Sequence, residues 1–247
     1  MDHSPVAGTR TRWGRGTLAE IALLLIVLLI FSWVHARVGT DAAVATANAL
    51  TLQSVERTLH LDIALGVNRW LTEHPALIMP AVLYYRLYYV VILGVLVWVY
   101  VRHAEVYLTV RRTLVAMLLL VLPVYWAVPM SPPRFALPGV VDILAGHDPF
   151  GAHTGQTAGA SVYSAMPSMH VGWSLWCAFA AWCALRGSHP RLAWLPWLFP
   201  LGMVAVVLAT GNHYVLDIAG SLVLLAAAIA AATAWGRLAG RRRPRAG

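Results

Sequence analysis

The stretch SVYSAMPSMHVGWSLWCAFAAWCAL, residues Ser161–Leu185, places a polar sequence directly before a long apolar run. Pro167, Ser168 and His170 lie at the entrance to that run, although the hydrocarbon of a bilayer offers an imidazole no hydrogen-bond partner. Pro at the start of a helix removes no hydrogen bond, and the free N–H groups of a helix N-terminus attract anions, phosphate above all. The pattern predicts an apolar helix whose polar end binds an anion.

Apolar runs of this kind recur along the whole chain. Hydrophobic residues make up 60% of the 247 residues and charged residues 11%, against about a quarter charged in a soluble domain. A helix crosses the hydrocarbon core of a bilayer with roughly 20 apolar residues. The sequence therefore predicts an all-α integral membrane protein, one membrane domain over residues 1–247, with six transmembrane helices at 17–36, 76–101, 113–129, 168–186, 192–210 and 213–236.

The basic residues, all of them Arg, predict the orientation of these spans. Of 18 Arg residues, 13 fall at the N-terminus, in alternate loops and in the basic tail 237–247. Four fall on the other side: Arg37, Arg57, Arg69 and Arg134. By the positive-inside rule we expect both termini in the cytoplasm and the loop 130–167 at the outer face of the plasma membrane, with a bacterial source. The net charge of +8 is then a topology signal and does not indicate nucleic-acid binding.

Three other features bear on the architecture. Residues 41–74 show helical apolar spacing with interleaved charges, which predicts an amphipathic helix that lies on the outer leaflet or packs on top of the bundle. The first apolar run is long for a signal peptide, so we expect an uncleaved span. Cys177 and Cys183 lie inside one apolar run, which favours a packing role.

Two histidines and an aspartate carry the chemistry that the sequence predicts. His213 and Asp217 are four residues apart at the start of the sixth apolar run, so on a helix they share a face. The carboxylate can then fix the tautomer of the imidazole, as in a catalytic triad, although an interfacial His with a capping Asp has the same spacing. His170, in the first turn after Pro167, is placed to donate a proton to a leaving oxygen.

Cationic and backbone groups on the same side complete a candidate phosphate site. Arg134 follows two prolines in SPPRF, and a guanidinium offers a phosphate two parallel hydrogen bonds. Ser168 and the backbone N–H of Met169 lie at a positive helix end. Arg86, in LYYRLYYVV, either extends to the interface or reaches a phosphate pocket lined by Tyr84, Tyr85, Tyr88 and Tyr89. His147, Asp148 and His153 look like ordinary polar loop residues.

At these residues the chain resembles the type 2 phosphatidic acid phosphatase (PAP2) superfamily of six-span membrane phosphoesterases. The family motifs, in order, are Lys-x6-Arg-Pro, Pro-Ser-Gly-His and Ser-Arg-x5-His-x3-Asp. Ala127, Met169 and Val207 stand where the first Lys, the Gly and the last Arg would fall. The variant PPRF…PSMH…HYVLD is similar to the branch that contains inositol phosphorylceramide synthases.

The resemblance implies a role for each matching residue. His213 would be the nucleophile, Asp217 its partner and His170 the general acid. Arg134, Ser168 and the Met169 backbone would hold the phosphate. The resemblance implies a phospholipid or lipid-linked phosphate as the substrate in the bilayer, and neither a metal nor a cofactor. It leaves the oligomeric state open.

Several alternatives stay open at this point. Transfer of a headgroup phosphate to an alcohol and hydrolysis by water use the same residues. A metal site of His170, His213 and Asp217 lacks a spacing such as His-Glu-x-x-His, and a protease with Ser168 as nucleophile lacks a Gly-x-Ser context. A lipid transporter would be the non-enzyme alternative, but the sequence shows no repeated halves.

Overall fold

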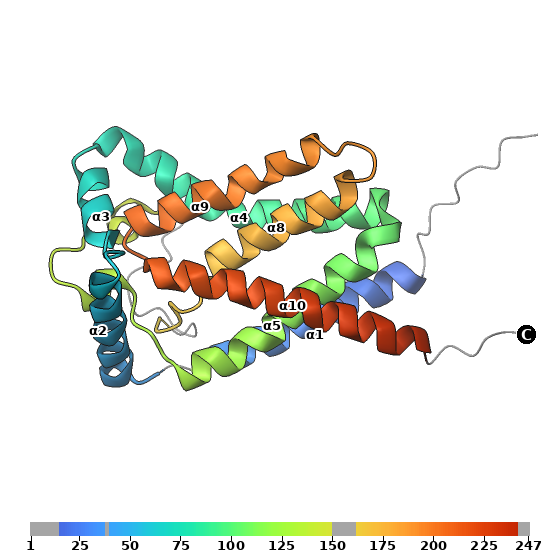
Figure 1. Ribbon diagram of the computed structural model, residues 1–247, viewed down its shortest axis with the longest axis horizontal. Helices are drawn as coiled ribbons and strands as arrows, with labels where there is room; N and C mark the ends of the chain where they lie inside the picture. Colours follow the sequence, from blue (N-terminus) through green and yellow to red (C-terminus); the bar gives the residue numbers. More distant parts are fainter. Residues whose placement is uncertain (1–14, 38–39, 150–161, 242–247) are drawn as a thin grey trace, which may run out of the picture.

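The computed structural model describes residues 15–37, 40–149 and 162–241, and all regular elements in these ranges are helices. Long helices lie side by side in an elongated bundle, and each runs antiparallel to the one before it along the chain (Figure 1). They are α1 (Arg15–His35), α4 (Pro75–Arg102), α5 (Ala104–Ala127), α8 (Met169–Leu185), α9 (Leu198–Ala209), which continues the 3-10 helix η1 (Leu192–Trp197), and α10 (Val215–Arg241).

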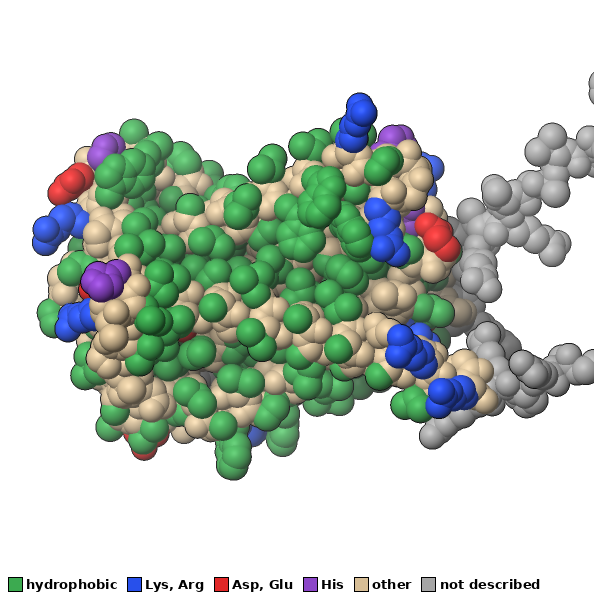
Figure 2. Space-filling model, in the orientation of Figure 1, with side chains coloured by type: hydrophobic (Ala, Val, Ile, Leu, Met, Phe, Trp, Pro, Cys, Tyr) green, Lys and Arg blue, Asp and Glu red, His purple; other side chains and the backbone are tan. Residues whose placement is uncertain are grey.

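The lengths and hydropathies of these helices fit a membrane protein. Five segments among the described residues are long and apolar enough to cross a bilayer: α1, α4, α5, the joined η1 and α9, and α10. The remaining apolar helix, α8, has 17 residues and is shorter than the others. Figure 2 shows hydrophobic side chains along the length of the bundle, with most charged side chains towards its two ends.

Helix α5 begins at Ala104, well before the predicted start at residue 113, and so includes Arg111 and Arg112. Two contacts explain how these cations are accommodated on a helix. The Arg111 guanidinium is ion-paired with Glu20 of α1. The Arg112 guanidinium lies 5.7 Å from the ring centroid of Trp235 in α10. Charge compensation and cation–π contact let the apolar helix extend through a basic pair that the sequence placed in a loop.

The segment predicted as one amphipathic helix forms two, α2 (Ala42–Thr58) and α3 (Ala64–Thr72). The chain turns between them at His60, whose φ of 58° lies in the left-handed region. Both helices lie at the same end of the bundle (Figure 1), where α2 packs on α10 and α3 on α9. The packing agrees with the expected helix on top of the bundle.

The core lies between α5, α8 and α10. Helix α8 is buried over most of its circumference, and its Trp176 is fully buried and donates to the Val110 carbonyl of α5 at 3.1 Å. Cys177 is buried and Cys183 half-buried, both as free thiols, which agrees with a packing role. Helix α8 therefore sits at the centre of the bundle, with its first turn facing the end that carries α2 and α3.

The long loop after α5 lies at this same end and contains two short helices, α6 (Pro133–Ala136) and α7 (Ile143–His147). Asn68 of α3 fastens the loop. Its amide Nδ2 donates to the carbonyls of Val141 at 3.0 Å and Ala209 at 2.9 Å, and its Oδ1 accepts from Val141 N at 2.8 Å. One fully buried side chain thus ties α3, the loop and the end of α9 together.

We expect Asn68→Ala to lower the free energy of unfolding by about 1–3 kcal/mol for each buried polar group left without a partner. Thermal unfolding of the purified protein in detergent measures the change. Asn48→Ala is the matched control, because half-buried Asn48 makes a single described bond, to the Pro129 carbonyl at 2.8 Å. Equal effects of the two variants would contradict the assigned role of Asn68.

Candidate active site

Most of the predicted site residues line one cavity of about 910 Å³, whereas Ser168 and Asp217 lie outside its lining. Its polar end is lined by residues from four separate segments: Arg86 of α4, Arg134 of α6, Met169 and His170 of α8, and Asn212 and His213 before α10. The long helices alternate in direction along the chain, so these segments lie towards the same end of the bundle (Figure 1). The structure thus brings together residues up to 127 positions apart, from Arg86 to His213.

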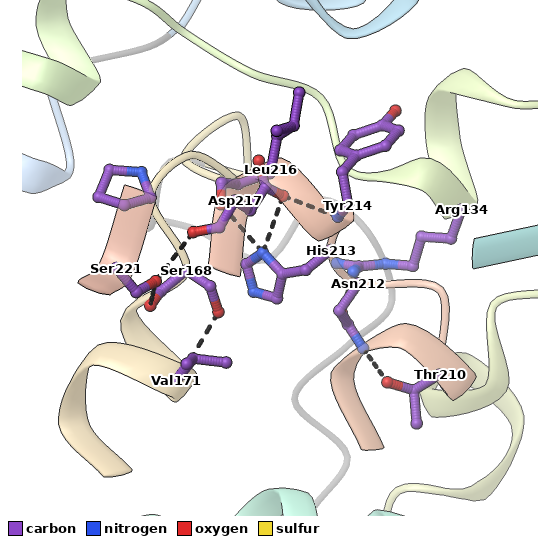
Figure 3. Close-up of polar contacts among 12 residues, drawn as sticks. Arg134, Ser168, Val171, Thr210, Asn212, His213, Tyr214, Leu216, Asp217 and Ser221 are labelled. Carbon is purple, nitrogen blue, oxygen red and sulfur yellow. Dashed lines mark hydrogen bonds and ion pairs between the residues drawn. The ribbon is translucent and has the colours of Figure 1, made fainter. Parts of the chain in front are cut away.

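The imidazole of His213 is held in one orientation by two acceptors. Its Nδ1 lies 3.2 Å from Asp217 Oδ2 and 2.9 Å from the Ala165 carbonyl oxygen. Because both partners accept, Nδ1 carries the proton, and Nε2 on the far side of the ring keeps its lone pair. Asp217 is itself fixed by the Tyr214 N–H, which donates to the same Oδ2 at 2.9 Å (Figure 3). This arrangement leaves Nε2 with its lone pair directed away from Asp217.

The second imidazole, His170, lines the same cavity from the first turn of α8. Its ring centroid lies 5.8 Å from that of His213. Tyr85 stacks on the His170 ring at 4.2 Å between centroids, and Tyr88 meets it edge-on at 4.8 Å. The two tyrosines of α4 therefore restrict the position of the ring opposite His213, which is the arrangement that a nucleophile and a separate proton donor require.

Arg134 reaches the cavity with its guanidinium already oriented. The side chain of Asn212 accepts a hydrogen bond from Arg134 Nη1, and Asp142 lies 3.3 Å from Arg134 Nε. Asn212 in turn donates from Nδ2 to Thr210 Oγ1 at 2.6 Å (Figure 3). Sequence reasoning missed Asn212. In the sequence Asn212 is only a polar residue next to His213. Its contact with Arg134, 78 positions away, leaves no pattern in the sequence around either residue.

Arg86 lines the cavity. Its guanidinium is ion-paired with Asp148, just after α7, and lies 5.9 Å from the Tyr85 ring centroid. Asp148, which the sequence left among ordinary loop residues, therefore holds a cation of the site. Of the predicted lining tyrosines, those at 85, 88 and 89 line the cavity. Tyr84 instead donates to the Phe199 carbonyl at 2.9 Å and packs α4 against α9.

His147 does not line the cavity. His147 is exposed and its Nδ1 lies 3.1 Å from the Ile143 carbonyl of its own helix. His153 falls outside the described residues.

Ser168 is the N-cap of α8 and is fully buried. Its Oγ accepts from Val171 N at 3.4 Å, its N–H donates to the Asp217 carbonyl at 3.2 Å, and its carbonyl accepts from Ser221 Oγ at 2.7 Å. These bonds join the first turn of α8 to that of α10 (Figure 3). Ser168 is absent from the lining of the cavity, so its role in phosphate binding stays a prediction.

A carboxylate that the sequence did not single out, Glu56 of α2, caps α10. It is fully buried, and its Oε1 accepts from Leu216 N at 2.7 Å. Burial raises the pKa of Glu56, the hydrogen bond from Leu216 opposes that rise, and the nearby Asp217 carboxylate adds to it. Helix α2 therefore holds the helical turn that carries Asp217. The contact joins residues 160 positions apart, which no local pattern reveals.

The geometry also bears on the alternative chemistries. Among residues 15–37, 40–149 and 162–241, no group of three or more His, Cys, Asp or Glu side chains is arranged to hold a metal ion. The Ser168 hydroxyl faces the backbone of its own helix, which is unfavourable for a serine nucleophile.

Comparison with known proteins identifies the family of the chain. A family model described as the PAP2 superfamily matches residues 50–231, which is 182 of the 247 residues. The match begins within α2, ends within α10 and includes every site residue named above. Neither a curated protein nor a solved structure matches the chain at a significant level.

Replacement of Glu56 tests its assignment as the cap of α10. An acid with a raised pKa in the folded state binds its proton more tightly there than in the unfolded chain. Wild-type stability therefore falls as the pH rises from the ordinary Glu value of 4.5 through the raised pKa. Glu56→Gln keeps an oxygen for the Leu216 N–H and removes the charge, so we expect thermal unfolding of this variant to lose that part of the pH dependence.

Glu56→Ala serves as the comparison, because it leaves the Leu216 N–H without its partner. We expect a loss of about 1–3 kcal/mol in the free energy of unfolding over the whole pH range. An unchanged pH dependence in Glu56→Gln, or a stability of Glu56→Ala equal to that of Glu56→Gln, would rule out the assignment.

Proposed function

Since the chain belongs to the PAP2 superfamily, we propose that it is a membrane phosphoesterase or phosphotransferase that acts on a lipid-linked phosphate through a phosphohistidine. One observation carries the proposal. His213 Nδ1 is bonded to two acceptors, which directs the Nε2 lone pair to the side of the ring away from Asp217, in a cavity shared with His170 and two arginines.

In the first half-reaction, His213 Nε2 attacks phosphorus and an N–P bond forms while the P–O bond to the leaving group breaks. His170, protonated, donates its proton to the departing oxygen, which leaves as a hydroxyl. Asp217 stabilises the positive charge that develops on the His213 ring. The two ring centroids are 5.8 Å apart, which is close enough for both imidazoles to contact one phosphoryl group bound beside them.

In the second half-reaction, a hydroxyl attacks phosphorus and the N–P bond breaks. His170, now neutral, takes the proton from the attacking oxygen, so both imidazoles return to their starting states. Arg134 and Arg86 stabilise the negative charge on the phosphoryl oxygens in both steps, because guanidinium groups match phosphate geometry. These two cations would compensate for the family Lys and Arg that Ala127 and Val207 replace.

The identity of the attacking hydroxyl distinguishes a transferase from a phosphatase. Apolar side chains dominate the cavity beyond the polar end, and exclusion of water favours a lipid alcohol as acceptor. We therefore place transfer of a phosphorylated headgroup to an alcohol first, as in the inositol phosphorylceramide synthase-like branch. Hydrolysis by water is the second candidate. Transport of the substrate without a reaction would not explain why Asp217 orients the imidazole of His213.

The membrane arrangement is part of the same proposal. All six apolar helices would span the bilayer. Helix α8 is short, but it would cross at the centre of the bundle, where the neighbouring helices separate its ends from lipid. Arg102, the last residue of α4, and Arg186 and Arg191, between α8 and η1, lie at the end of the bundle away from the site, which favours cytoplasmic termini and an outer-face site. Helices α2 and α3 would then lie at the outer interface, beside the lipid headgroups.

Turnover by purified variants in lipid nanodiscs tests the mechanism. We expect His213→Ala to abolish product formation from labelled phospholipids, with and without added alcohols, as identified by mass. His170→Asn loses the proton donor and should lower kcat by about 10²–10⁴-fold. His147→Ala, a change in an exposed histidine at the same end, is the control and should keep wild-type turnover.

The same assay separates the alternatives. Turnover should continue in excess EDTA, and Ser168→Ala should keep measurable turnover that His213→Ala lacks. Loss of activity in EDTA with recovery on added zinc would favour a metal enzyme. Substrate flux across vesicles that survives His213→Ala would favour a transporter.

Asn212→Ala tests how Arg134 is held. A hydrogen bond to a charged group contributes about 1.5–3 kcal/mol, so its loss should raise KM for the phosphate substrate by about tenfold or more. We expect kcat to change less than KM, because neither imidazole touches Asn212 in the described contacts. Asn212→Asp, which keeps the acceptor oxygen, should restore most of the affinity. A fall in kcat with unchanged KM would contradict the positioning role.

A further inference from the structure

One of the two acceptors that orient the His213 imidazole is a carbonyl outside any helix. The Ala165 oxygen lies 2.9 Å from His213 Nδ1, closer than the Asp217 carboxylate at 3.2 Å. Asp217 is held by the hydrogen bonds of α10, whereas residues 162–168 form no helix and only an isolated backbone bridge to Met130. Outside a regular element, a backbone carbonyl is held by the specific contacts that its segment makes. The anchors of this segment therefore bear on the direction of the ring.

Three hydrogen bonds hold the backbone on the two sides of the Ala165 carbonyl. Before it, the Ala165 N–H donates to the Met130 carbonyl at 3.1 Å, and Met130 N donates to the Tyr163 carbonyl at 2.7 Å. After it, the Tyr125 hydroxyl of α5 donates to the Pro167 carbonyl at 3.2 Å. The direction of the carbonyl therefore depends on contacts both before and after it in the chain.

A histidine of α1 contacts residues on both sides of this carbonyl. His35 Nε2 lies within hydrogen-bond distance of Ser164 Oγ, at 3.0 Å. The His35 ring also contacts that of Tyr125, with the two centroids 5.3 Å apart. Phe31, one turn earlier on α1, stacks on the same imidazole at 5.5 Å between centroids, with an interplanar angle of 11°. The imidazole thus packs against two aromatic rings while its Nε2 reaches the residue before Ala165.

The position of His35 differs from that of an ordinary interfacial histidine. His35 is the last residue of α1, where a polar side chain without further contacts would extend to the headgroups. It is instead half-buried and lines the cavity together with Ser164. No residue in the apolar window of α1 is buried, so close packing contributes little to holding this helix. Thr17 and Glu20 make polar contacts at its other end, and His35 makes them at the end that carries the site.

We propose that His35 is a positioning residue for His213. It acts through Ser164 and Tyr125, which hold the chain on either side of Ala165. The Ala165 carbonyl then stays directed at His213 Nδ1, and Nε2 of the same ring stays directed into the cavity. Helix α1 lies outside the segment that the PAP2 family model matches, so the inference adds to the site a residue that the match does not include. It rests on the proposed function only in taking His213 as the nucleophile.

Substitution of His35 tests the proposal by comparing kcat with KM for the full-length protein in nanodiscs. His35→Phe keeps an aromatic ring for the contacts with Phe31 and Tyr125 and removes the nitrogen that reaches Ser164. The substrate is the labelled phospholipid that the wild type turns over fastest. We expect kcat to fall by about 10- to 100-fold, because a small misplacement of a reacting group has an effect of this size. KM should stay close to the wild-type value, because both arginines of the site are untouched. His35→Gln, which places an amide near the position of Nε2, should restore most of kcat.

Two further variants make this comparison specific. Ser164→Ala removes the hydroxyl that contacts His35, so the effects of His35→Phe and Ser164→Ala on kcat should not add in the double variant. Trp33→Phe, another aromatic replacement on α1, is the control, because Trp33 is 60% exposed and does not line the cavity. Thermal unfolding of each variant in detergent checks that the fold is retained. Additive effects, a raised KM with unchanged kcat, or an equal loss of kcat in Trp33→Phe would overturn the proposal.

Nuclear magnetic resonance of protein with ¹⁵N-labelled histidine detects the same effect without turnover. The proton on His213 Nδ1 lies between two acceptors, and its resonance is assigned by its loss in His213→Ala. We expect this resonance to move in His35→Phe and in Ser164→Ala, and to stay in place in Trp33→Phe.

The two measurements distinguish this inference from the proposed function. If the wild type turns over phospholipid, His213→Ala does not, and His35→Phe changes neither kcat nor the resonance, the chemistry stands and the positioning role fails. If the resonance moves in His35→Phe but no phospholipid is turned over by the wild type, the proposed reaction fails and the positioning role stands.

Discussion

The imidazole of His213 has one orientation because its Nδ1 hydrogen lies between two oxygens, the Asp217 carboxylate and the Ala165 carbonyl. Much of the surrounding structure serves to keep those oxygens in place. Ser168 binds the carbonyl of Asp217 through its N–H, and Glu56 holds the N–H of Leu216. Helices α2, α8 and α10 therefore meet at the acid–base pair, and a shift of any one of them would change the direction of Nε2.

The bilayer imposes the second constraint. Charged side chains are costly in hydrocarbon, so those that lie within the bundle are paired: Arg86 with Asp148 beside the site, and Arg111 with Glu20 at the opposite end of the cavity. Between these pairs the cavity wall is mostly apolar. One continuous space thus has cationic side chains at one end, a mostly apolar wall along its length and the Arg111–Glu20 ion pair at the other end.

The sequence predicted the class of fold and most of the candidate site for physical reasons. Hydropathy identifies an apolar helix because lipid tolerates little else. The spacing of four residues predicted the contact of His213 with Asp217, although His213 lies just before α10 and not on it. The helix start at Ser168 follows from Pro167 and the serine cap. Assignment to the PAP2 superfamily was confirmed by the family model, whereas membership in a particular branch stays a prediction.

What the sequence did not predict depends on contacts between distant segments. Asn212 orients Arg134, Asp148 pairs with Arg86 and Glu56 caps α10, and each of these partners is more than 60 residues away. The break between α2 and α3 depends on a single residue with positive φ, His60, and on packing against the bundle. Such features have no periodicity to detect, since tertiary structure alone brings the partners together.

Trapping the proposed bond between phosphorus and a nitrogen of His213 would test the mechanism. Purified protein would be incubated briefly with a labelled lipid phosphate, quenched at alkaline pH to preserve phosphohistidine, and mapped by mass spectrometry. We expect a phosphoryl group on the peptide that contains His213, with a larger trapped fraction in His170→Asn if the second step is slowed more than the first. A phosphoryl group on Ser168, or turnover with no phosphorylated peptide at any time, would contradict it.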